Sequence, residues 1–471
     1  MASKKWQVAS GKSSLNSDHW KLNTDYRTLI TVYGPLALLL FALTQAGVWQ
    51  RADWGATAVP ITYQNGMRLL DSQIEAQTIP ADESVLLQFY WDALHTPDQV
   101  YQTNVVLVDE AGLLWSPGGT TAPRLFRGPP PTNQWSPGHY AADWHLLEPL
   151  PGTPPGSYQM RLALFERQSE RLVSVVGGGP DMLVGDLSVT RPRTPLPVES
   201  VSPQYGSGAV WSGLRLLGYN LDRETAVPGD PFLLTLFWHT MAAPEADWQV
   251  QLTLYDEADL PILTRLLPPV TADLPTSQWQ ADDLWRGQHL LRLPAGLGQG
   301  QHRWELALCA PQAAGECVPL APAAPLGTLQ INAPERDFVV PELTTPTETA
   351  VGEVATLVGA IIAEDETELV VDLIWRAEQE TAVSYRVFLH LVGPDGSLID
   401  QSDGEPSQWQ RPTTGWLPGE IIQDRHQLTW PAERPAGMYS LLAGLYDPVT
   451  GERLLAVGEE TAVVVATWLM E

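Results

Sequence analysis

The strongest constraint on the fold of this chain is a pentapeptide that occurs three times. It reads Pro-Thr-Asn-Gln-Trp at residues 131–135, Pro-Thr-Ser-Gln-Trp at 275–279 and Pro-Thr-Thr-Gly-Trp at 412–416. Ten residues after the tryptophan of each copy comes a histidine: His145, His289 and His426. Before each copy, an apolar run ends in another tryptophan: Trp91, Trp238 and Trp375. Matching spacing at several landmarks indicates internal repetition.

The repetition divides most of the chain into three modules of about 120–140 residues, with expected limits at residues 60–190, 204–332 and 348–468. Proline-rich joints separate them, TRPRTPLPVESVSP (190–203) and NAPERDFVVPELTTPT (332–347). Within each module, short runs with two-residue alternation are interrupted by Gly, Pro, Asn or Asp, which is typical of antiparallel β-sandwiches. We therefore predict an all-β body of three tandem antiparallel β-sandwich modules, Ig-like or jelly-roll-like.

A 21-residue stretch without charged residues, residues 29–49, precedes the modules. An α-helix of this length can cross the hydrocarbon core of a bilayer. The basic residues lie before it, so the positive-inside rule predicts a cytoplasmic tail at residues 1–28 and an extracytoplasmic body. The alternative is a signal peptide cleaved after Thr44-Gln45-Ala46, but the basic and apolar regions are long for one. We expect a retained transmembrane helix in the cell membrane.

The charge of the chain is strongly uneven. Residues 1–51 carry a net charge of +4, which leaves −32 on the remainder of a chain whose total is −28. An acidic body of this size repels phosphate backbones, so nucleic acid is not expected as a partner.

The repeated tryptophans fall into two groups. The earlier tryptophan of each module joins the apolar face of an alternating strand, as Leu87, Phe89 and Trp91 do, and is predicted to lie in the core. The tryptophans of the pentapeptides lie in turns, where alternation gives no guidance. They could stack on sugar rings as ligand contacts or cap the core from a loop; these candidate ligand-binding residues are Trp135, Trp279 and Trp416.

Few other residues nominate a site. Cys309 and Cys317 flank a predicted hairpin turn, and we expect a disulfide between them. Asp143 and His145 share a strand face, but a pair of mixed ligands makes a poor metal site, so a hydrogen bond between neighbours is the preferred interpretation. No nucleophile elbow, metalloprotease motif or phosphate-binding loop occurs. We expect no catalytic residue, metal or cofactor.

The third module resembles a known family. The run Pro412-Thr413-x-x-Trp416-x-Pro418-Gly419-Glu420 is followed by Asp424-Arg425-His426, by Pro435-Ala436-Gly437-Met438-Tyr439, and by a segment that begins Gly444-Leu445-Tyr446-Asp447-Pro448. It resembles the soluble C-terminal β-sandwich module of bacterial polytopic, mannosyltransferase-like glycosyltransferases. The likeness is good in the second module and weaker in the first. It implies an envelope-glycan setting and transfers no catalytic residue, because the many-helix catalytic domain of that family has no counterpart here.

These observations lead to three functional hypotheses. The first is a non-catalytic, membrane-anchored binding or spacer protein of the bacterial cell envelope, with an envelope glycan or a membrane glycosyltransferase as partner. The second is an enzyme acting on envelope polysaccharide at a module interface. The third is a purely structural surface protein. An exposed aromatic strip would favour glycan binding, whereas two carboxylates facing across a cleft would favour a hydrolase.

Overall fold

The computed structural model describes residues 60–125, 130–138, 140–311, 317–320, 322–456, 458 and 460–471. Within them the protein is all-β, and its strands form six sheets. None of the helices in this part of the chain is long and apolar enough to cross a membrane. The predicted tail at residues 1–28 and span at residues 29–49 lie outside the described residues.

The first two sheets enclose one hydrophobic cluster and are called the first sheet pair (residues 61–190). In spatial order, one sheet contains β1 (Ile61–Thr62), β2 (Met67–Ile74), β4 (Val85–Ala93), β8 (Ala141–Leu147) and β7 (Arg124–Leu125). The other contains β3 (Thr78–Pro80), β10 (Asp181–Thr190), β9 (Gly156–Glu166), β5 (Tyr101–Val108) and β6 (Gly119–Thr121).

The second sheet pair (residues 205–331) encloses the next cluster. One sheet contains β11 (Tyr205–Gly206), β13 (Leu214–Leu221), β15 (Pro231–Thr240) and β18 (Leu284–Arg292), with β12 (Val210–Trp211) also paired to β13. The other contains β14 (Thr225–Ala226), β21 (Ala324–Ile331), β19 (Gly300–Pro311), β16 (Gln249–Tyr255) and β17 (Pro261–Leu267), with β20 (Cys317–Pro319) paired to β19.

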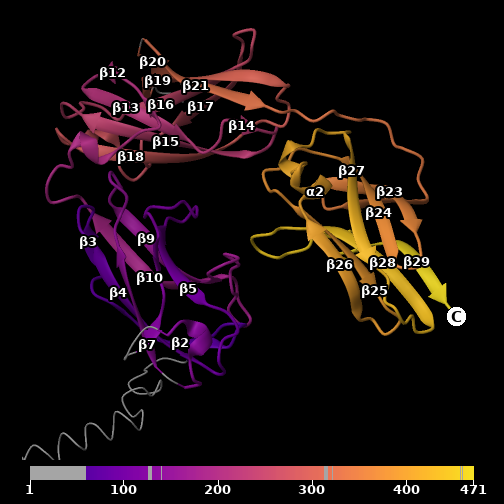
Figure 1. Ribbon diagram of the computed structural model, residues 1–471. Helices are drawn as coiled ribbons and strands as arrows, with labels where there is room; N and C mark the ends of the chain where they lie inside the picture. The colour runs from indigo at the N-terminus through magenta and orange to yellow at the C-terminus, as the bar shows by residue number, and fades with distance from the viewer. Residues whose placement is uncertain are drawn as a thin grey trace, which may run out of the picture.

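The third sheet pair (residues 345–470) has two four-stranded sheets around its own cluster. The first contains β22 (Thr345–Val351), β23 (Ala355–Glu364), β24 (Glu368–Ala377) and β27 (Ile421–Thr429). The second contains β26 (Leu398–Gly404), β25 (Arg386–Val392), β28 (Gly437–Tyr446) and β29 (Val463–Met470). In Figure 1 the second sheet pair lies at the top of an open arch whose two sides are the first and third pairs.

The sheets are antiparallel apart from two short contacts. β3 pairs with β10, and β14 with β21, in parallel. In each case the chain leaves the first sheet, adds two or three residues to the edge of the opposite sheet, and returns for the next long strand. The long strands thus pair antiparallel, as predicted, and the two short parallel contacts were not predicted.

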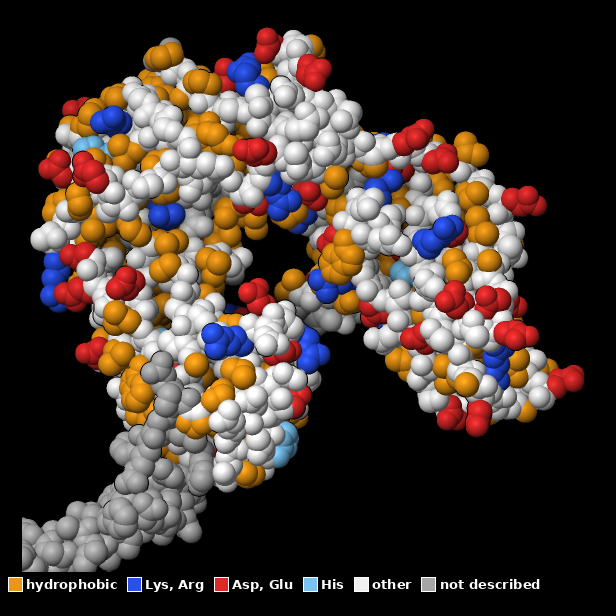
Figure 2. Space-filling model, viewed as in Figure 1, with side chains coloured by type: hydrophobic (Ala, Val, Ile, Leu, Met, Phe, Trp, Pro, Cys, Tyr) orange, Lys and Arg blue, Asp and Glu red, His pale blue; other side chains and the backbone are white. Residues whose placement is uncertain are grey.

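Alternation explains the cores. Trp91, Trp238 and Trp375 are fully buried, as their strand positions predicted. The residues beside them in sequence point the other way, so each sheet contributes one apolar face to the space between the two layers. Acidic side chains are spread over the outside of all three pairs (Figure 2).

One arginine in each joint binds the sheet pair that follows that joint. Arg191 forms an ion pair with Asp283 and donates to the carbonyl of Gln278. Arg336 forms an ion pair with Glu420 and donates to the carbonyl of Gly415. Each carbonyl belongs to the fourth residue of a repeated pentapeptide, and each carboxylate lies five residues later. The joints therefore use the repeated turn as an acceptor.

The preceding sheet pair contributes backbone carbonyl groups to the same joints. The amide of Arg286 in β18 donates to Gly152 O of the first pair, at 2.8 Å. The Thr414 hydroxyl of the third pair donates to Gly229 O of the second, at 2.8 Å. Neighbouring sheet pairs are thus in direct contact.

Candidate functional site

The threonine of each pentapeptide ties together the two sheets of its pair. Its hydroxyl accepts a hydrogen bond from the amide that enters the second sheet, at 2.8 Å for Tyr101 and Trp248 and 2.9 Å for Tyr385. The same hydroxyl donates to the backbone carbonyl two positions before that amide, which belongs to Gln99, Ala246 or Val383. The threonines are buried, and each lies in a 3-10 turn: η2 (Thr132–Gln134), η4 (Thr276–Gln278) and η5 (Thr413–Gly415).

The tryptophans of the pentapeptides lie inside the cores. Trp135, Trp279 and Trp416 are 1%, 2% and 1% exposed. The indole N–H groups of Trp279 and Trp416 donate to carbonyls five residues earlier, at 3.1 and 3.0 Å. A ring buried in this way cannot stack on a sugar unless its loop opens, so these positions fit the core-capping alternative better than the ligand-contact alternative.

The histidine that follows the first pentapeptide belongs to a buried polar cluster in the first pair. His145 Nε2 lies 3.1 Å from Asp143 Oδ2 and 3.0 Å from the Thr103 hydroxyl. Thr121 also hydrogen-bonds Asp143. Burial by itself would raise the pKa of Asp143, but these hydrogen bonds outweigh it and hold that pKa below its ordinary value. The predicted hydrogen bond between strand neighbours is present.

The third pair repeats this arrangement, and the second does not. His426 Nε2 lies 2.8 Å from Asp424 Oδ2. In the second pair Gly287 occupies the position of the aspartate, and a Cβ there would lie 2.2 Å from Pro269 O. His289 Nε2 instead lies 3.4 Å from that carbonyl. Burial lowers the pKa of His289 to about 4.

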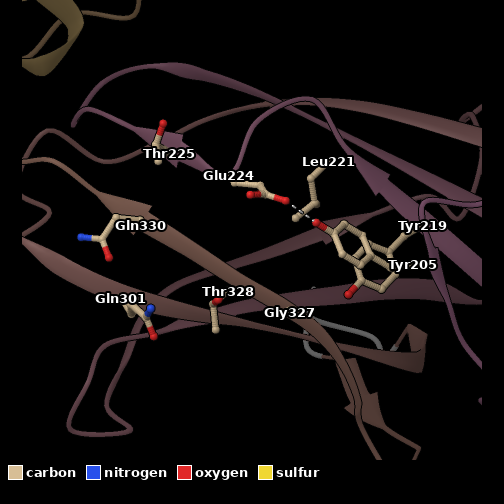
Figure 3. A pocket seen from close by; sticks show the side chains of 9 residues that line it. All are labelled: Tyr205, Tyr219, Leu221, Glu224, Thr225, Gln301, Gly327, Thr328 and Gln330. Atoms are coloured by element: carbon tan, nitrogen blue, oxygen red, sulfur yellow. Dashed lines mark hydrogen bonds between the residues drawn. The ribbon is translucent and has the colours of Figure 1, made fainter.

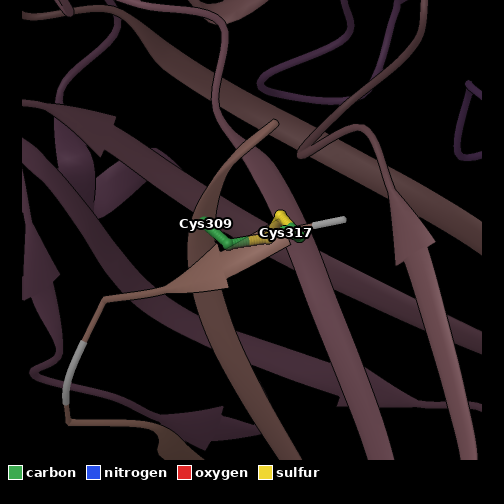
Figure 4. Close-up of a disulfide and its surroundings, with 2 residues drawn as sticks. All are labelled: Cys309 and Cys317. Atoms are coloured by element: carbon green, nitrogen blue, oxygen red, sulfur yellow. A yellow bond between two sulfur atoms is a disulfide. The ribbon is translucent and has the colours of Figure 1, made fainter. Parts of the chain in front are cut away.

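Cys309 and Cys317 form a disulfide (Figure 4). Their Cα atoms are 5.5 Å apart. Cys309 lies in β19, two residues before the end of that strand, and Cys317 is the first residue of β20. The third pair closes the corresponding turn with a β-bridge between Tyr446 and Arg453. The disulfide therefore crosslinks the two strands of a hairpin.

A pocket of about 420 Å³ opens in the second sheet pair, where its two sheets meet at their edge. Its size falls in the range of small-molecule sites. The rings of Tyr205 and Tyr219 stack at one end, 5.1 Å apart and inclined by 22° (Figure 3). Gly327 leaves space for the Tyr219 hydroxyl, because a Cβ at this glycine would lie 3.0 Å from that oxygen. The remaining lining residues are Leu221, Glu224, Thr225, Gln301, Thr328 and Gln330.

The polar groups of this pocket are mostly neutral. Glu224 is the one charged residue in the lining, and its carboxylate accepts a hydrogen bond from the Tyr205 hydroxyl at 2.9 Å. That hydrogen bond raises the pKa of Tyr205. Figure 3 shows Gln301, Gln330 and Thr328 away from the tyrosines, toward the other end. Amides, hydroxyls and one carboxylate beside an aromatic ring can bind a polyhydroxylated ligand and disfavour an anionic one.

Sequence reasoning did not find this pocket or the arginines of the joints. Its residues come from β11, β13, β14, β19 and β21 and, for Glu224, from the turn between β13 and β14, so no local pattern unites them. The two arginines had a detectable signal, since Arg191 and Arg336 stand near the start of the two proline-rich joints. Among the described residues, no group of three or more His, Cys, Asp or Glu side chains could hold a metal ion.

Comparison with known proteins gives no family. No protein-family model matches the chain, and no curated protein matches it.

Proposed function

We propose that this chain is a non-catalytic glycan-binding protein whose three sheet pairs are tandem copies of one β-sandwich module. In this proposal residues 29–49 anchor it in the cell membrane and the modules lie outside the cytoplasm, in an envelope-glycan setting. The resemblance of residues 412–454 to the glycosyltransferase-associated module supports that setting. The module limits are those of the sequence, 60–190, 204–332 and 348–468.

The observation that carries the proposal is the pocket beside Tyr205 and Tyr219. A sugar ring presents C–H groups on one face and hydroxyl groups around its rim, so it suits an aromatic ring flanked by amides and hydroxyls. The single lining carboxylate, Glu224, argues against a hydrolase at this site, because glycoside hydrolysis generally requires two carboxyl groups. The buried threonines and tryptophans of the repeated turns then have structural roles that keep each module closed.

The test measures the binding of neutral disaccharides to the full-length chain by saturation-transfer NMR and calorimetry. Glu224→Gln removes a charged acceptor of sugar hydroxyls and should weaken binding about ten-fold or more. Glu245→Gln, an exposed glutamate of the same sheet pair, is the matched control and should change nothing. Absence of saturable binding across the panel, or equal binding by both variants, would remove the basis of the proposal.

A further inference from the structure

The outer face of the sheet that contains β2, β4 and β8 carries an aromatic and amide surface. Residues opposite one another form rows across these three strands. Gln73, Gln88 and Trp144 form one row, and Asp71, Tyr90 and Ala142 form the next. Because alternate residues of a strand share a face, all of these side chains point away from the core.

Two tyrosines lie together on this surface. The rings of Tyr90 and Tyr140 stack with centroids 5.4 Å apart and an angle of 22°. The Tyr90 hydroxyl donates to the amide oxygens of Gln73 or Gln88, at 3.2 and 2.9 Å. These amides belong to the neighbouring row, so the Tyr90 ring lies along the sheet rather than standing out from it.

Trp144 extends the surface along β8. Its side chain is 51% exposed, although most of the tryptophans in the described part of the chain are buried. Leu146, the next residue on the same face, is 57% exposed. Trp144 lies four positions after Tyr140, which places their Cα atoms ~13 Å apart along an extended strand. The aromatic rings thus form a strip longer than one sugar unit.

The corresponding rows of the second and third pairs do not present an exposed aromatic ring. In the second pair, Gln288 takes the place of Trp144 and donates to Leu114 O of the first pair, so the neighbouring pair covers it. In the third pair the row contains Arg425 and Asp372, which form a two-pronged ion pair. Of these three corresponding rows, the one in the first pair carries the exposed aromatic side chain.

The strands β2, β4 and β8 carry little positive charge on this face. Their one arginine, Arg68, is paired with the buried Asp92, and Arg124 of the neighbouring β7 lies opposite Ala142 at the edge of the surface. Asp71 adds a negative charge beside Tyr90, and the chain as a whole carries −28. A protein partner would need an apolar contact centre several times larger than one tryptophan and one leucine. A linear, neutral polysaccharide fits better, because each of its units offers an apolar face to the rings and hydroxyls to the glutamine amides.

We infer that the Tyr90–Tyr140–Trp144 strip binds a neutral, extended polysaccharide chain along β8, at a site separate from the Tyr205 pocket. The inference rests on the proposed glycan-binding function and adds to it a surface for polymers, whereas the pocket accepts a short sugar. Aromatic stacking would supply the affinity, and Gln73 and Gln88 would orient the chain by hydrogen bonds to its hydroxyls.

The experiment is affinity electrophoresis of the full-length chain through gels that contain a neutral or an anionic polymer of the same backbone. Hydroxyethyl cellulose is the neutral probe and carboxymethyl cellulose the anionic one, with mixed-linkage β-glucan and galactomannan as further neutral polymers. We expect retardation by at least one neutral polymer and none by the anionic one. Trp144→Ala should weaken it about ten-fold, because aromatic residues at the centre of a contact surface contribute most of the affinity.

Two control variants separate the possible outcomes. Trp409→Ala removes an exposed tryptophan of the third pair (58% exposed) and should leave retardation unchanged. Tyr205→Ala should abolish disaccharide binding in the pocket while leaving polymer retardation intact. Equal retardation of the Trp144→Ala variant and the unmodified chain, or retardation by none of the neutral polymers, would overturn the inference. Loss of polymer retardation in Tyr205→Ala would also overturn it and leave the pocket as the glycan site.

Discussion

His145 in the first sheet pair and His289 in the second occupy the same place in their strands but meet different partners. His145 shares a hydrogen-bonded cluster with Asp143 and two threonines. His289 faces the backbone carbonyl of Pro269, which also accepts the indole N–H of Trp238 at 3.1 Å. The comparison teaches that a repeat can retain a polar side chain after losing its partner, provided that a backbone atom fills the vacated space.

The largest effect is expected when the second pair receives an aspartate at position 287, which corresponds to Asp143 of the first pair. Gly287→Asp would place a Cβ 2.2 Å from Pro269 O and bury a negative charge beside a carbonyl. We expect a loss of about 3–5 kcal/mol of stability in the second pair. Hydrogen exchange measured by mass spectrometry should show increased exchange in β15 and β18, with β4 and β24 unchanged. Normal protection in β15 would show that the Pro269 segment adapts.

A change of pH should reveal the environment of His289 through the stability of the second pair, without any mutation. The pKa of His289 is about 4 in the folded chain, against an ordinary value of 6.5. The unfolded chain therefore binds an additional proton between pH 6.5 and 4, and stability falls as the pH drops through this range. The expected loss is about 3 kcal/mol in the second pair.

Hydrogen exchange of the second pair at pH 6.5, 5.5 and 4.5, corrected for intrinsic rates, would measure this loss. The His289→Gln variant supplies the control, since it removes the titrating group and should flatten the profile. Aspartates with lowered pKa values, such as Asp247 in the same pair, act below about pH 3.8 and leave this window undisturbed. A profile as steep in the variant as in the original chain would assign the effect to another group.

A milder change would make the first pair resemble the second. Asp143→Asn retains the shape but removes the charge that His145 and the threonines stabilise. We expect a loss of about 1–3 kcal/mol in the first pair at neutral pH. Because the pKa of Asp143 is lowered by folding, its contribution exists above pH 3.8 and disappears as the pH falls through the folded value. The variant and the original chain should converge in strongly acidic solution; a constant difference would mean that the charge is unimportant.

Much of the fold could be predicted from residue alternation and repeated spacing. Alternation assigned Trp91 and its two counterparts to the core, because a strand leaves only two directions for a side chain. Alternation could not predict whether Trp135 is buried or exposed, because this residue lies in a turn. The threonine three residues before Trp135 receives its hydrogen bond from Tyr101, 31 residues away in the chain, and no local rule specifies such a partner.

The candidate sites were harder to predict for two physical reasons. The pocket beside Tyr205 draws on five strands, so its residues meet only after both sheets have formed. The environment of His289 depends on a carbonyl, which every residue possesses and no sequence pattern reveals. Trp144 was not predicted as a site residue, although the alternation of β8 places it on the face away from Asp143 and His145.

The joints have a consequence for how such an array can grow. Arg191 and Arg336 each lie on the same stretch of chain as the carboxylate that holds them, the joint and the sheet pair that follows it. The preceding pair supplies carbonyl oxygens, such as Gly152 O and Gly229 O, and in the first joint also the carboxylates of Asp82 and Glu83, which bind Arg193. Duplication or deletion of one joint together with its following sheet pair therefore keeps the partners of the Arg191–Asp283 and Arg336–Glu420 ion pairs together. A cut between joint and sheet pair separates them.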